Sequence, residues 1–371
     1  MLGLGLVDLL AVEPPEHPEP RFDAQDKEAR LRGESEAWDT AQVTPARAGD
    51  IPLIDVSDYL AEKSAAALQE VAARLRLACT EVGFYSLVGH GIAGWQFNDI
   101  FTQAARLHDL PLDAKLALAM DSPDAEALGR PPGSGYLRVG HRKLPRRERG
   151  NRNEAFIVKR DHRIKLSENP WPDEQSLPGF RTVVESYAAA METLALSLLP
   201  IYAIALGVDK RFFEPGFIDP FYRLRLTHYP AQPLPPATHA PTPYYGIAPH
   251  VDTTFFTLLA QDSPGLCVFS EQRRCWVEVP QIDGALIVNT GELLKQWSND
   301  EFISVKHFAN ARSVSELNPA PDQHSRYSVP FFFNANADYP MHCIPSCCST
   351  DRPPKYPAIS YAQSQGVVQG E

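Results

Sequence analysis

The spacing of apolar residues divides the chain into a mainly helical first half and a β-rich second half. Apolar side chains recur every three or four positions between Leu68 and Ala78, which is the spacing of an amphipathic helix. Ser64 precedes this stretch and Gly83 follows it, so the sequence predicts a helix with a serine N-cap that ends at the glycine. The apolar residues within Ile51–Val56 predict a short strand before that helix.

Further predicted elements of both kinds follow along the chain. Helical spacing predicts helices over Trp95–His108, Asp113–Leu118 and Phe180–Leu206. Runs rich in β-branched and aromatic residues predict strands at Phe84–Val88, Tyr222–Tyr229, Thr253–Leu259, Leu266–Phe269, Trp276–Val279, Ala285–Asn289, Phe302–Phe308 and Tyr327–Asn334. Many short strands separated by turns favour a sandwich or a jelly roll.

These patterns divide the chain into four parts. Residues 1–48 are rich in Glu, Pro, Ala and Arg and are expected to form a flexible extension, with a short helix near residues 24–37. Residues 49–215 are the mainly helical region, residues 216–346 the jelly-roll core and residues 347–371 a C-terminal tail. A basic stretch at 138–152 is either a solvated loop or an anion-attracting lid over a site.

Composition and charge exclude several classes of protein. With 44% hydrophobic and 22% charged residues among 371, the chain has the composition of an ordinary globular protein. The formal net charge of −11 repels phosphate backbones, so no nucleic acid is expected as a partner. The longest apolar run, Leu194–Leu206, is interrupted by Ser197 and Pro200, so we expect no membrane-spanning helix.

Cysteine usage and the N-terminus indicate the compartment. The six cysteines form no CxxC pair, which suits a reducing environment. Cys343, Cys347 and Cys348 are either a metal or redox site or three free thiols. Met1–Leu10 contains no basic residue and no small-residue cleavage site, so we expect a cytoplasmic protein without a secretory signal. Its oligomeric state, monomer or dimer, stays open.

Two histidines and one aspartate are candidate metal ligands. Residues i and i+2 of a strand point to the same face, so His250 and Asp252 can converge on one point. His307 lies in another predicted strand and supplies a third donor if the sheet curls back. Two imidazoles and one carboxylate are the donor set of non-haem Fe(II) oxygenases, whereas zinc prefers a closed tetrahedral site or a single open position.

Arg326 and Ser328 are a candidate anion-binding pair. They lie two residues apart at the start of an apolar predicted strand, so their side chains share one face. A guanidinium turned into an apolar barrel requires an anion, because an unpaired buried charge is costly. A dicarboxylate that binds the metal by its other end would meet that requirement.

The order of these motifs resembles that of the 2-oxoglutarate- and Fe(II)-dependent dioxygenase superfamily, in its isopenicillin N synthase-like branch. The resemblance covers roughly residues 51–346, and the joint order of the motifs is specific. The matching stretches are Ile51–Asp55, Ala78–Phe84, Val88–Ile92, Gly246–Asp252, Thr257–Asp262, Gly284–Leu294, His307 and Arg326–Ser328. Asn169–Pro172 and Leu293–Asp300 are similar to microbial members that include thymine hydroxylases.

The resemblance implies a fold, cofactors and site residues. The implied fold is α+β, with a double-stranded β-helix core (jelly-roll, cupin-like) and a helical N-terminal region packed against it. The implied iron ligands are His250, Asp252 and His307, and the residues implied to bind 2-oxoglutarate are Arg326, Ser328 and Tyr229. The implied enzyme uses Fe(II), 2-oxoglutarate and O2 to hydroxylate, desaturate or cyclise a small organic metabolite, with release of succinate and CO2.

Substrate contacts are predicted from strand parity and from position in the family. The candidates are Arg225, Phe332, Asn334 and Phe156, each with core packing or a solvent-facing position as the alternative. An inward and unpaired Arg225 would indicate a substrate with a carboxylate or an electron-rich carbonyl. His228 is expected to point to the opposite face in a structural role. The chain departs from the family at Thr227, where Asn is frequent, and at Phe308, where Arg is frequent.

Two other functions stay open on sequence alone. Oxidases of the same fold, such as isopenicillin N synthase and aminocyclopropane-carboxylate oxidase, keep the RxS motif without using 2-oxoglutarate, so Arg326 and Ser328 do not separate them from this chain. The second alternative is a jelly-roll binding protein without catalysis. The inward charges predicted at Asp252 and Arg326 argue against it, because a dry core gives no reason to keep them.

Overall fold

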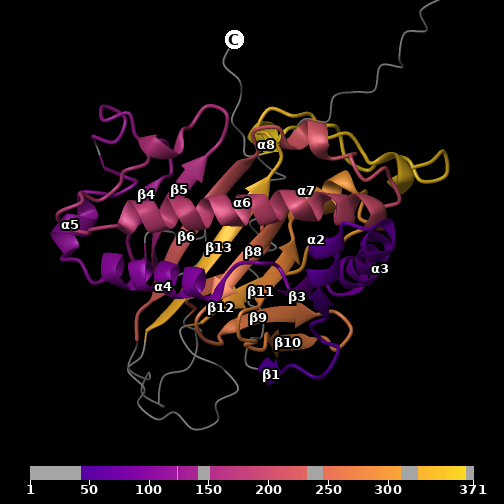
Figure 1. Cartoon of the computed structure of the whole chain (residues 1–371), viewed down its shortest axis with the longest axis horizontal. Helices are drawn as coiled ribbons and strands as arrows, with labels where there is room; N and C mark the ends of the chain where they lie inside the picture. Colours follow the sequence, from indigo (N-terminus) through magenta and orange to yellow (C-terminus); the bar gives the residue numbers. More distant parts are fainter. Residues whose placement is uncertain (1–42, 123, 141–150, 232–244, 311–324, 365–371) are drawn as a thin grey trace, which may run out of the picture.

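Two facing β-sheets and a layer of helices make up the part of the chain that the structure describes. This structure is a computed structural model that describes residues 43–122, 124–140, 151–231, 245–310 and 325–364. The helix expected near residues 24–37 and most of the basic stretch 138–152 lie outside these ranges. Figure 1 shows the long helix α6 (Phe180–Ala205) lying across the larger sheet.

The larger sheet has eight strands within the described ranges. In spatial order they are β2 (Leu53–Asp55), β3 (Phe84–Val88), β11 (Leu286–Thr290), β8 (Phe256–Gln261), β13 (Arg326–Asn334), β6 (Phe221–Tyr229), β5 (Glu154–Arg160) and β4 (Gly135–Leu137). The central strands β8, β13, β6 and β5 pair antiparallel. Side chains therefore alternate between a face covered by helices and a face turned to the smaller sheet.

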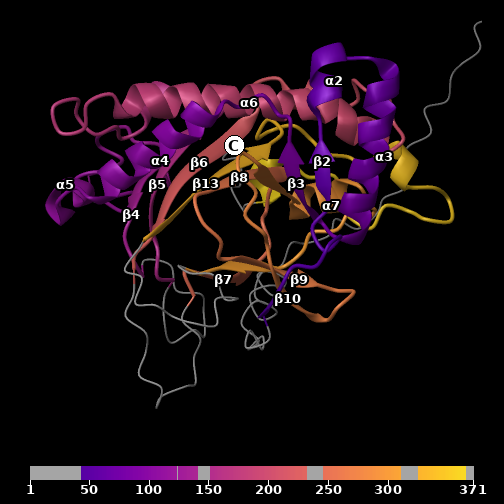
Figure 2. The ribbon, with the colours of Figure 1, turned by 60° about the horizontal axis from the view of Figure 1, so that its bottom comes forward.

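The smaller sheet carries the strands of the jelly roll that lie opposite. Its order is β1 (Val43–Pro45), β10 (Cys275–Glu278), β9 (Leu266–Ser270), β12 (His307–Ala309) and β7 (Ile247–His250). Figure 2 shows β7, β9 and β10 on the side of the larger sheet that faces away from α6. β1 belongs to the expected extension, yet it pairs in parallel with β10, and Arg273 Nη2 donates to Thr44 Oγ1 at 2.7 Å.

The helices bury the outer face of the larger sheet. Their bounds are α2 (Ser57–Glu62), α3 (Ala65–Glu81), α4 (Gly94–His108), α5 (Leu112–Leu116), α6, α7 (Glu292–Trp297) and α8 (Tyr361–Ser364), with 3-10 turns η1 (Leu166–Glu168), η2 (Glu214–Phe217) and η3 (Pro345–Cys347). α6 contacts α3, α4 and β13. Among the described helices, α6 alone is long and apolar enough to cross a membrane, but 56% of its apolar window is buried inside the protein, as in a core helix.

Most predicted elements are confirmed, with small shifts of their ends. Ser64 caps α3 by accepting a hydrogen bond from Ala67 N at 3.2 Å, and α6 ends just before Gly207, which has a φ of 74°. The strand predicted over Phe302–Phe308 is wrong in extent, because only His307–Ala309 pairs as β12. Phe302 is instead buried in the hydrophobic core, so burial without strand pairing explains that apolar run. The strands β1, β4, β5 and β7 were not predicted from the sequence.

Gly291, the N-cap of α7, allows this helix to hold the segment that follows β7. Glu292 N donates to Asp252 O at 2.7 Å, and Leu293 N donates to Thr254 O at 3.1 Å. A Cβ atom at residue 291 would lie 1.9 Å from Thr254 O, which is far inside van der Waals contact. Only glycine therefore permits this approach, which fixes the position of Asp252.

We predict that Gly291→Ala lowers the free energy of unfolding by about 1–3 kcal/mol, because the added methyl group must displace backbone. Gly94→Ala is the matched control: Gly94 begins α4, and a Cβ there has no atom within 4 Å. The control should leave the protein as stable or up to about 1 kcal/mol more stable, given alanine's helix propensity. Urea denaturation of both variants measures the difference, and equal stabilities would contradict the prediction.

Candidate active site

The three candidate metal ligands meet where β7 and β12 pair. His250 and His307 are directly opposite one another in this antiparallel pair. The prediction that His250 and Asp252 share one strand is wrong: β7 ends at His250, and Asp252 lies in the irregular segment held by α7. The convergence therefore comes from cross-strand pairing and from the segment held by α7, not from alternation along a single strand.

The donor atoms surround one point. Asp252 Oδ1 lies 3.6 Å from His250 Nε2 and 3.7 Å from His307 Nε2, and the two imidazole centroids are 4.3 Å apart. These separations leave room for an ion coordinated at about 2.1 Å by each atom. The side chain of His250 is 29% exposed, whereas those of Asp252 and His307 are 7% and 9% exposed. The site is therefore accessible from the His250 side.

Hydrogen bonds set both imidazoles for metal binding. His250 Nδ1 lies 2.8 Å from Ala248 O, and His307 Nδ1 lies 3.2 Å from Val305 O. Because a carbonyl oxygen only accepts, each Nδ1 carries the proton and each Nε2 presents its lone pair to the shared point. Backbone carbonyls that fix the tautomer in this way are typical of histidine metal ligands.

Two residues that the sequence analysis did not assign orient the carboxylate. Thr257 Oγ1 donates to Asp252 Oδ2 at 2.7 Å, and Asn289 Nδ2 donates to the same atom at 2.9 Å. Oδ1 is thereby left for the metal. Both residues lie on the larger sheet and in stretches that match the family, but only the fold shows that they face Asp252.

Electrostatics keep Asp252 and His307 in metal-binding protonation states. Burial by itself would raise the pKa of Asp252, but the neighbouring His307 and His250 and the Asn289 amide outweigh it and hold that pKa below its usual range. Burial, aided by the adjacent His250, lowers the pKa of His307 to about 4. At neutral pH the site therefore offers an anionic oxygen and a neutral imidazole, a combination that suits Fe(II).

Arg326 places a buried cation on the inner face of the larger sheet. It is 1% exposed; its Nε donates to Ser263 O at 3.0 Å and its Nη2 to Gln261 Oε1 at 2.9 Å. Its Nη1 is buried without a hydrogen-bond partner among the described residues. Next to it, Tyr229 OH and Ser328 Oγ lie 3.3 Å apart. A carboxylate fits this cluster, because it would accept from the unpartnered nitrogen and from a hydroxyl.

Three of the four predicted substrate residues lie on that same inner face. Strand alternation puts Arg225 on the same face of β6 as Tyr229, and Phe332 and Asn334 on the same face of β13 as Ser328. Arg225 and Phe332 are half-buried. Asn334 is fully buried, and its Oδ1 accepts from Phe255 N at 3.0 Å, so it also supports the turn before β8.

Phe156 is a correction to the predicted pocket. It is fully buried on the helix-covered face, and its ring lies 5.6 Å from that of Phe180, the first residue of α6. The prediction failed because β5 was not recognised, so its register was unknown: Ala155 and Ile157, not Phe156, alternate onto the inner face. His228 points to the helix-covered side, as expected.

Comparison with known proteins identifies the family. A model of the 2OG-Fe(II) oxygenase superfamily matches residues 220–335, and one for the non-haem dioxygenase in morphine synthesis N-terminal region matches residues 51–174. The 2-oxoglutarate-Fe(II) type oxidoreductase hxnY of Emericella nidulans is 30% identical to this chain, over 85% of this chain and 90% of its own.

Solved structures give the same result. The chain superposes on a full-length Neurospora crassa protein in complex with alpha-KG (2-oxoglutarate) with a TM-score of 0.73 and 25% identity, over 85% of this chain and 94% of that one. For the same Neurospora crassa protein with alpha-KG and thymine, the TM-score is 0.72 and the identity 26%, over 84% and 94%. The chain belongs to the 2OG-Fe(II) oxygenase superfamily, which confirms the predicted family, the double-stranded β-helix fold and the use of Fe(II) and 2-oxoglutarate.

We predict that His307→Ala weakens Fe(II) binding at least about tenfold and abolishes turnover, because one of three ligands is lost. His342→Ala is the control, since His342 is exposed and lies outside the site. Anaerobic titration with Fe(II) or Co(II) measures the affinity, and circular dichroism checks that both variants stay folded. A folded His307→Ala protein that binds metal as tightly as the control would contradict the ligand assignment.

Proposed function

We propose that this protein oxidises a small organic molecule at an iron held by His250, Asp252 and His307, with 2-oxoglutarate as co-substrate. The observation that carries the proposal is the convergence of these three donors in a sheet sandwich that also buries the cation of Arg326. Iron bound there supplies the activation of dioxygen. The protein's own side chains determine which molecules enter, how they are oriented and how water is excluded.

Arg326, Ser328 and Tyr229 form the proposed binding site for the distal carboxylate of 2-oxoglutarate. The free Nη1 of Arg326 would donate to one carboxylate oxygen, and the hydrogen-bonded pair of Ser328 and Tyr229 hydroxyls would donate its remaining proton to the other. The guanidinium cannot swing away, because its Nε and Nη2 are already bonded and its Cζ lies 4.7 Å from the Tyr229 ring centroid. Such a fixed donor set orients the co-substrate before the reaction.

The adjacent wall supports a substrate class. Arg223 and Arg225 alternate onto the inner face of β6, and the Arg223 guanidinium lies 5.0 Å from the ring centroid of Phe332. A cation over an aromatic ring, with a second arginine on the same face of the strand, favours a planar molecule that carries a carboxylate or an electron-rich carbonyl. We propose such a molecule as substrate and assign Arg225 and Phe332 as contacts. One of the solved Neurospora crassa complexes contains thymine, a planar ring compound with carbonyl groups.

The compartment is part of the proposal as well. The six cysteines are free thiols, which supports a reducing cytoplasm. The net charge of −11 supports a small-molecule partner and no nucleic acid.

We predict that Arg326→Lys raises the Kd for 2-oxoglutarate at least about tenfold, because an ammonium cannot reproduce the fork that a carboxylate binds. Fe(II) affinity should stay unchanged, since Arg326 is not among the metal-binding group. Anaerobic titration of the Fe(II)-loaded protein measures both affinities. Arg160→Lys is the control, because Arg160 pairs with Glu192 on the other face of the sheet. Unaltered 2-oxoglutarate binding in Arg326→Lys would contradict the assignment of Arg326 to the carboxylate-binding site.

The reaction is tested by a substrate screen that measures succinate. We expect one succinate per oxidised molecule, and hits enriched in planar carboxylates or carbonyl compounds over matched neutral hydrocarbons. Arg225→Leu should raise the KM for the acidic hits about tenfold or more while the Kd for 2-oxoglutarate holds constant, because a charge-assisted bond is lost. Turnover without 2-oxoglutarate would show that the protein is an oxidase of the same fold instead. An unchanged KM in Arg225→Leu would show that Arg225 does not contact the substrate.

A further inference from the structure

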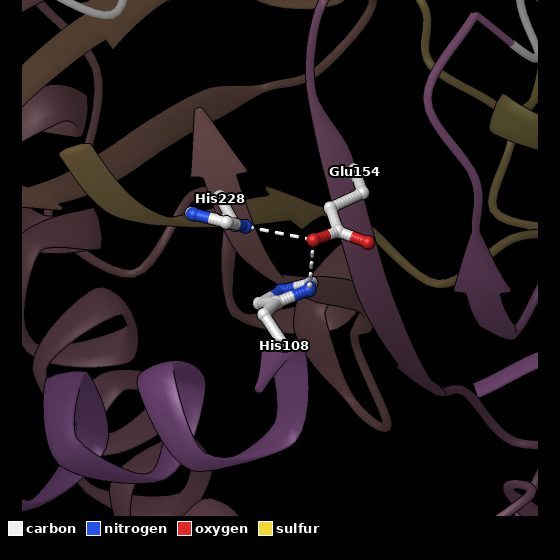
Figure 3. A group of neighbouring side chains, drawn as sticks. All are labelled: His108, Glu154 and His228. Carbon is white, nitrogen blue, oxygen red and sulfur yellow. Dashed lines mark hydrogen bonds and ion pairs between the residues drawn. The ribbon is translucent and has the colours of Figure 1, made fainter. Parts of the chain in front are cut away.

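A second cluster of buried ionisable groups lies on the opposite face of the same strands. The Glu154 carboxylate is its centre (Figure 3): Oε1 lies 2.7 Å from His228 Nδ1 and 3.5 Å from His108 Nδ1. Its Oε2 accepts from Lys115 Nζ at 3.0 Å and from the Tyr136 hydroxyl. The two histidines, Lys115 and Glu154 are buried, and nothing in the proposed reaction uses them.

A metal ion is the first occupant to consider for this cluster. Donor atoms of His108, Glu154 and His228 lie within 4.8 Å of one another. The ammonium of Lys115, however, already balances the carboxylate charge at 3.0 Å. A divalent ion would add two positive charges beside that ammonium in a dry environment, where the cost of unbalanced charge is high. The cluster is better described as an ion pair extended by hydrogen bonds.

The cluster occupies one row across three neighbouring strands. Glu154 of β5 stands opposite His228 of β6, and His228 stands opposite Tyr327 of β13. The His228 and Tyr327 rings are stacked with centroids 4.8 Å apart and an angle of 12° between their planes. Burial by itself would raise the pKa of Glu154, but the neighbouring His108 and His228 hold that pKa well below the usual range, so it stays an anion.

Directly behind this row lie the residues proposed to bind 2-oxoglutarate. Tyr229 is the chain neighbour of His228, and Arg326 and Ser328 flank Tyr327. Tyr229 and Arg326 also pair in register, and this is the last pair of the β6–β13 ladder at that end. Because successive side chains share one stretch of backbone, a strand rotation that moves His228 or Tyr327 on one face moves Tyr229 and Arg326 on the other.

We propose that Glu154 is a positioning residue for the co-substrate: by holding His228 and the stacked Tyr327, it fixes the orientation of Tyr229 and Arg326 toward the distal carboxylate of 2-oxoglutarate. This inference rests on the 2-oxoglutarate site proposed above. It gives a role to an anion, an ammonium and two imidazoles that lie buried on a largely hydrophobic face. A row of apolar residues could fill the same volume, but without a charge-assisted bond it would leave the strand end less constrained.

Glu154→Gln tests this role, because glutamine keeps the volume of the side chain and removes its charge. Tyr327→Leu removes the stacked ring and keeps Glu154. It therefore tests the same positioning of Tyr229 and Arg326 if the first variant folds poorly. For both we expect the Kd for 2-oxoglutarate, measured by calorimetry on anaerobic Fe(II)-loaded protein, to rise about tenfold. Fe(II) affinity and the KM of the primary substrate should change less than about twofold. Metal analysis should find one iron per chain and no second ion.

Glu192→Gln is the matched control. Glu192 of α6 forms an ion pair with Arg160 at the far end of β5, so the variant removes a part-buried ion pair from the same strand without touching the row. It should bind 2-oxoglutarate as the unmodified protein does.

Three results would overturn the proposal. The first is a Glu154→Gln protein that melts earlier but binds 2-oxoglutarate with unchanged affinity, which would make the cluster purely structural. The second is an equal loss of Fe(II) and 2-oxoglutarate affinity, and the third a second divalent ion that Glu154→Gln releases. Weaker binding in Arg326→Lys together with normal binding in Glu154→Gln would reject this inference alone. Normal binding in Arg326→Lys would reject the 2-oxoglutarate site and this inference together.

Discussion

Two imidazole lone pairs and one carboxylate oxygen stay together in a protein interior only when the surrounding structure fixes each of them. Here the fixing groups come from both sheets. The smaller sheet sets His250 opposite His307, while Thr257 and Asn289 of the larger sheet hold Asp252. The ligand geometry therefore depends on the distance between the sheets. That distance is maintained by a separate hydrophobic cluster that packs β3, β8 and β11 of the larger sheet against β9 and β10 of the smaller one.

The strands β6 and β13 each contribute side chains to two different environments. Their alternate residues either join the core under the helices, as Leu224, Phe331 and Phe333 do, or line the interior between the sheets, as Arg225 and Arg326 do. The Glu154 cluster departs from this pattern on the helix-covered side, because it is polar next to the apolar side chains of β6 and β13. The cluster lies directly behind Tyr229 and Arg326, which face the proposed 2-oxoglutarate site on the other side of the sheet.

Much of the fold and of the metal site could be predicted from the sequence. Helix α3 carried its own cap signal, and the order of His250, Asp252, His307 and Arg326 was specific enough for the family. The failures have physical reasons. Phe156 was assigned to the wrong face because a strand's parity is known only once its register is known. Thr257 and the partners of Glu154 were missed because contacts between residues distant in sequence leave no local pattern.

The parallel pairing of β1 with β10 has a consequence for how the protein is handled. Val43–Pro45 covers the outer edge of the smaller sheet, next to the buried Trp276. A recombinant fragment that begins at residue 49 would uncover the amide and carbonyl groups of Cys275–Glu278 along that edge. Bare edges of this kind recruit strands from other molecules and promote aggregation. Trimming the N-terminal region to improve crystals should therefore stop before Val43.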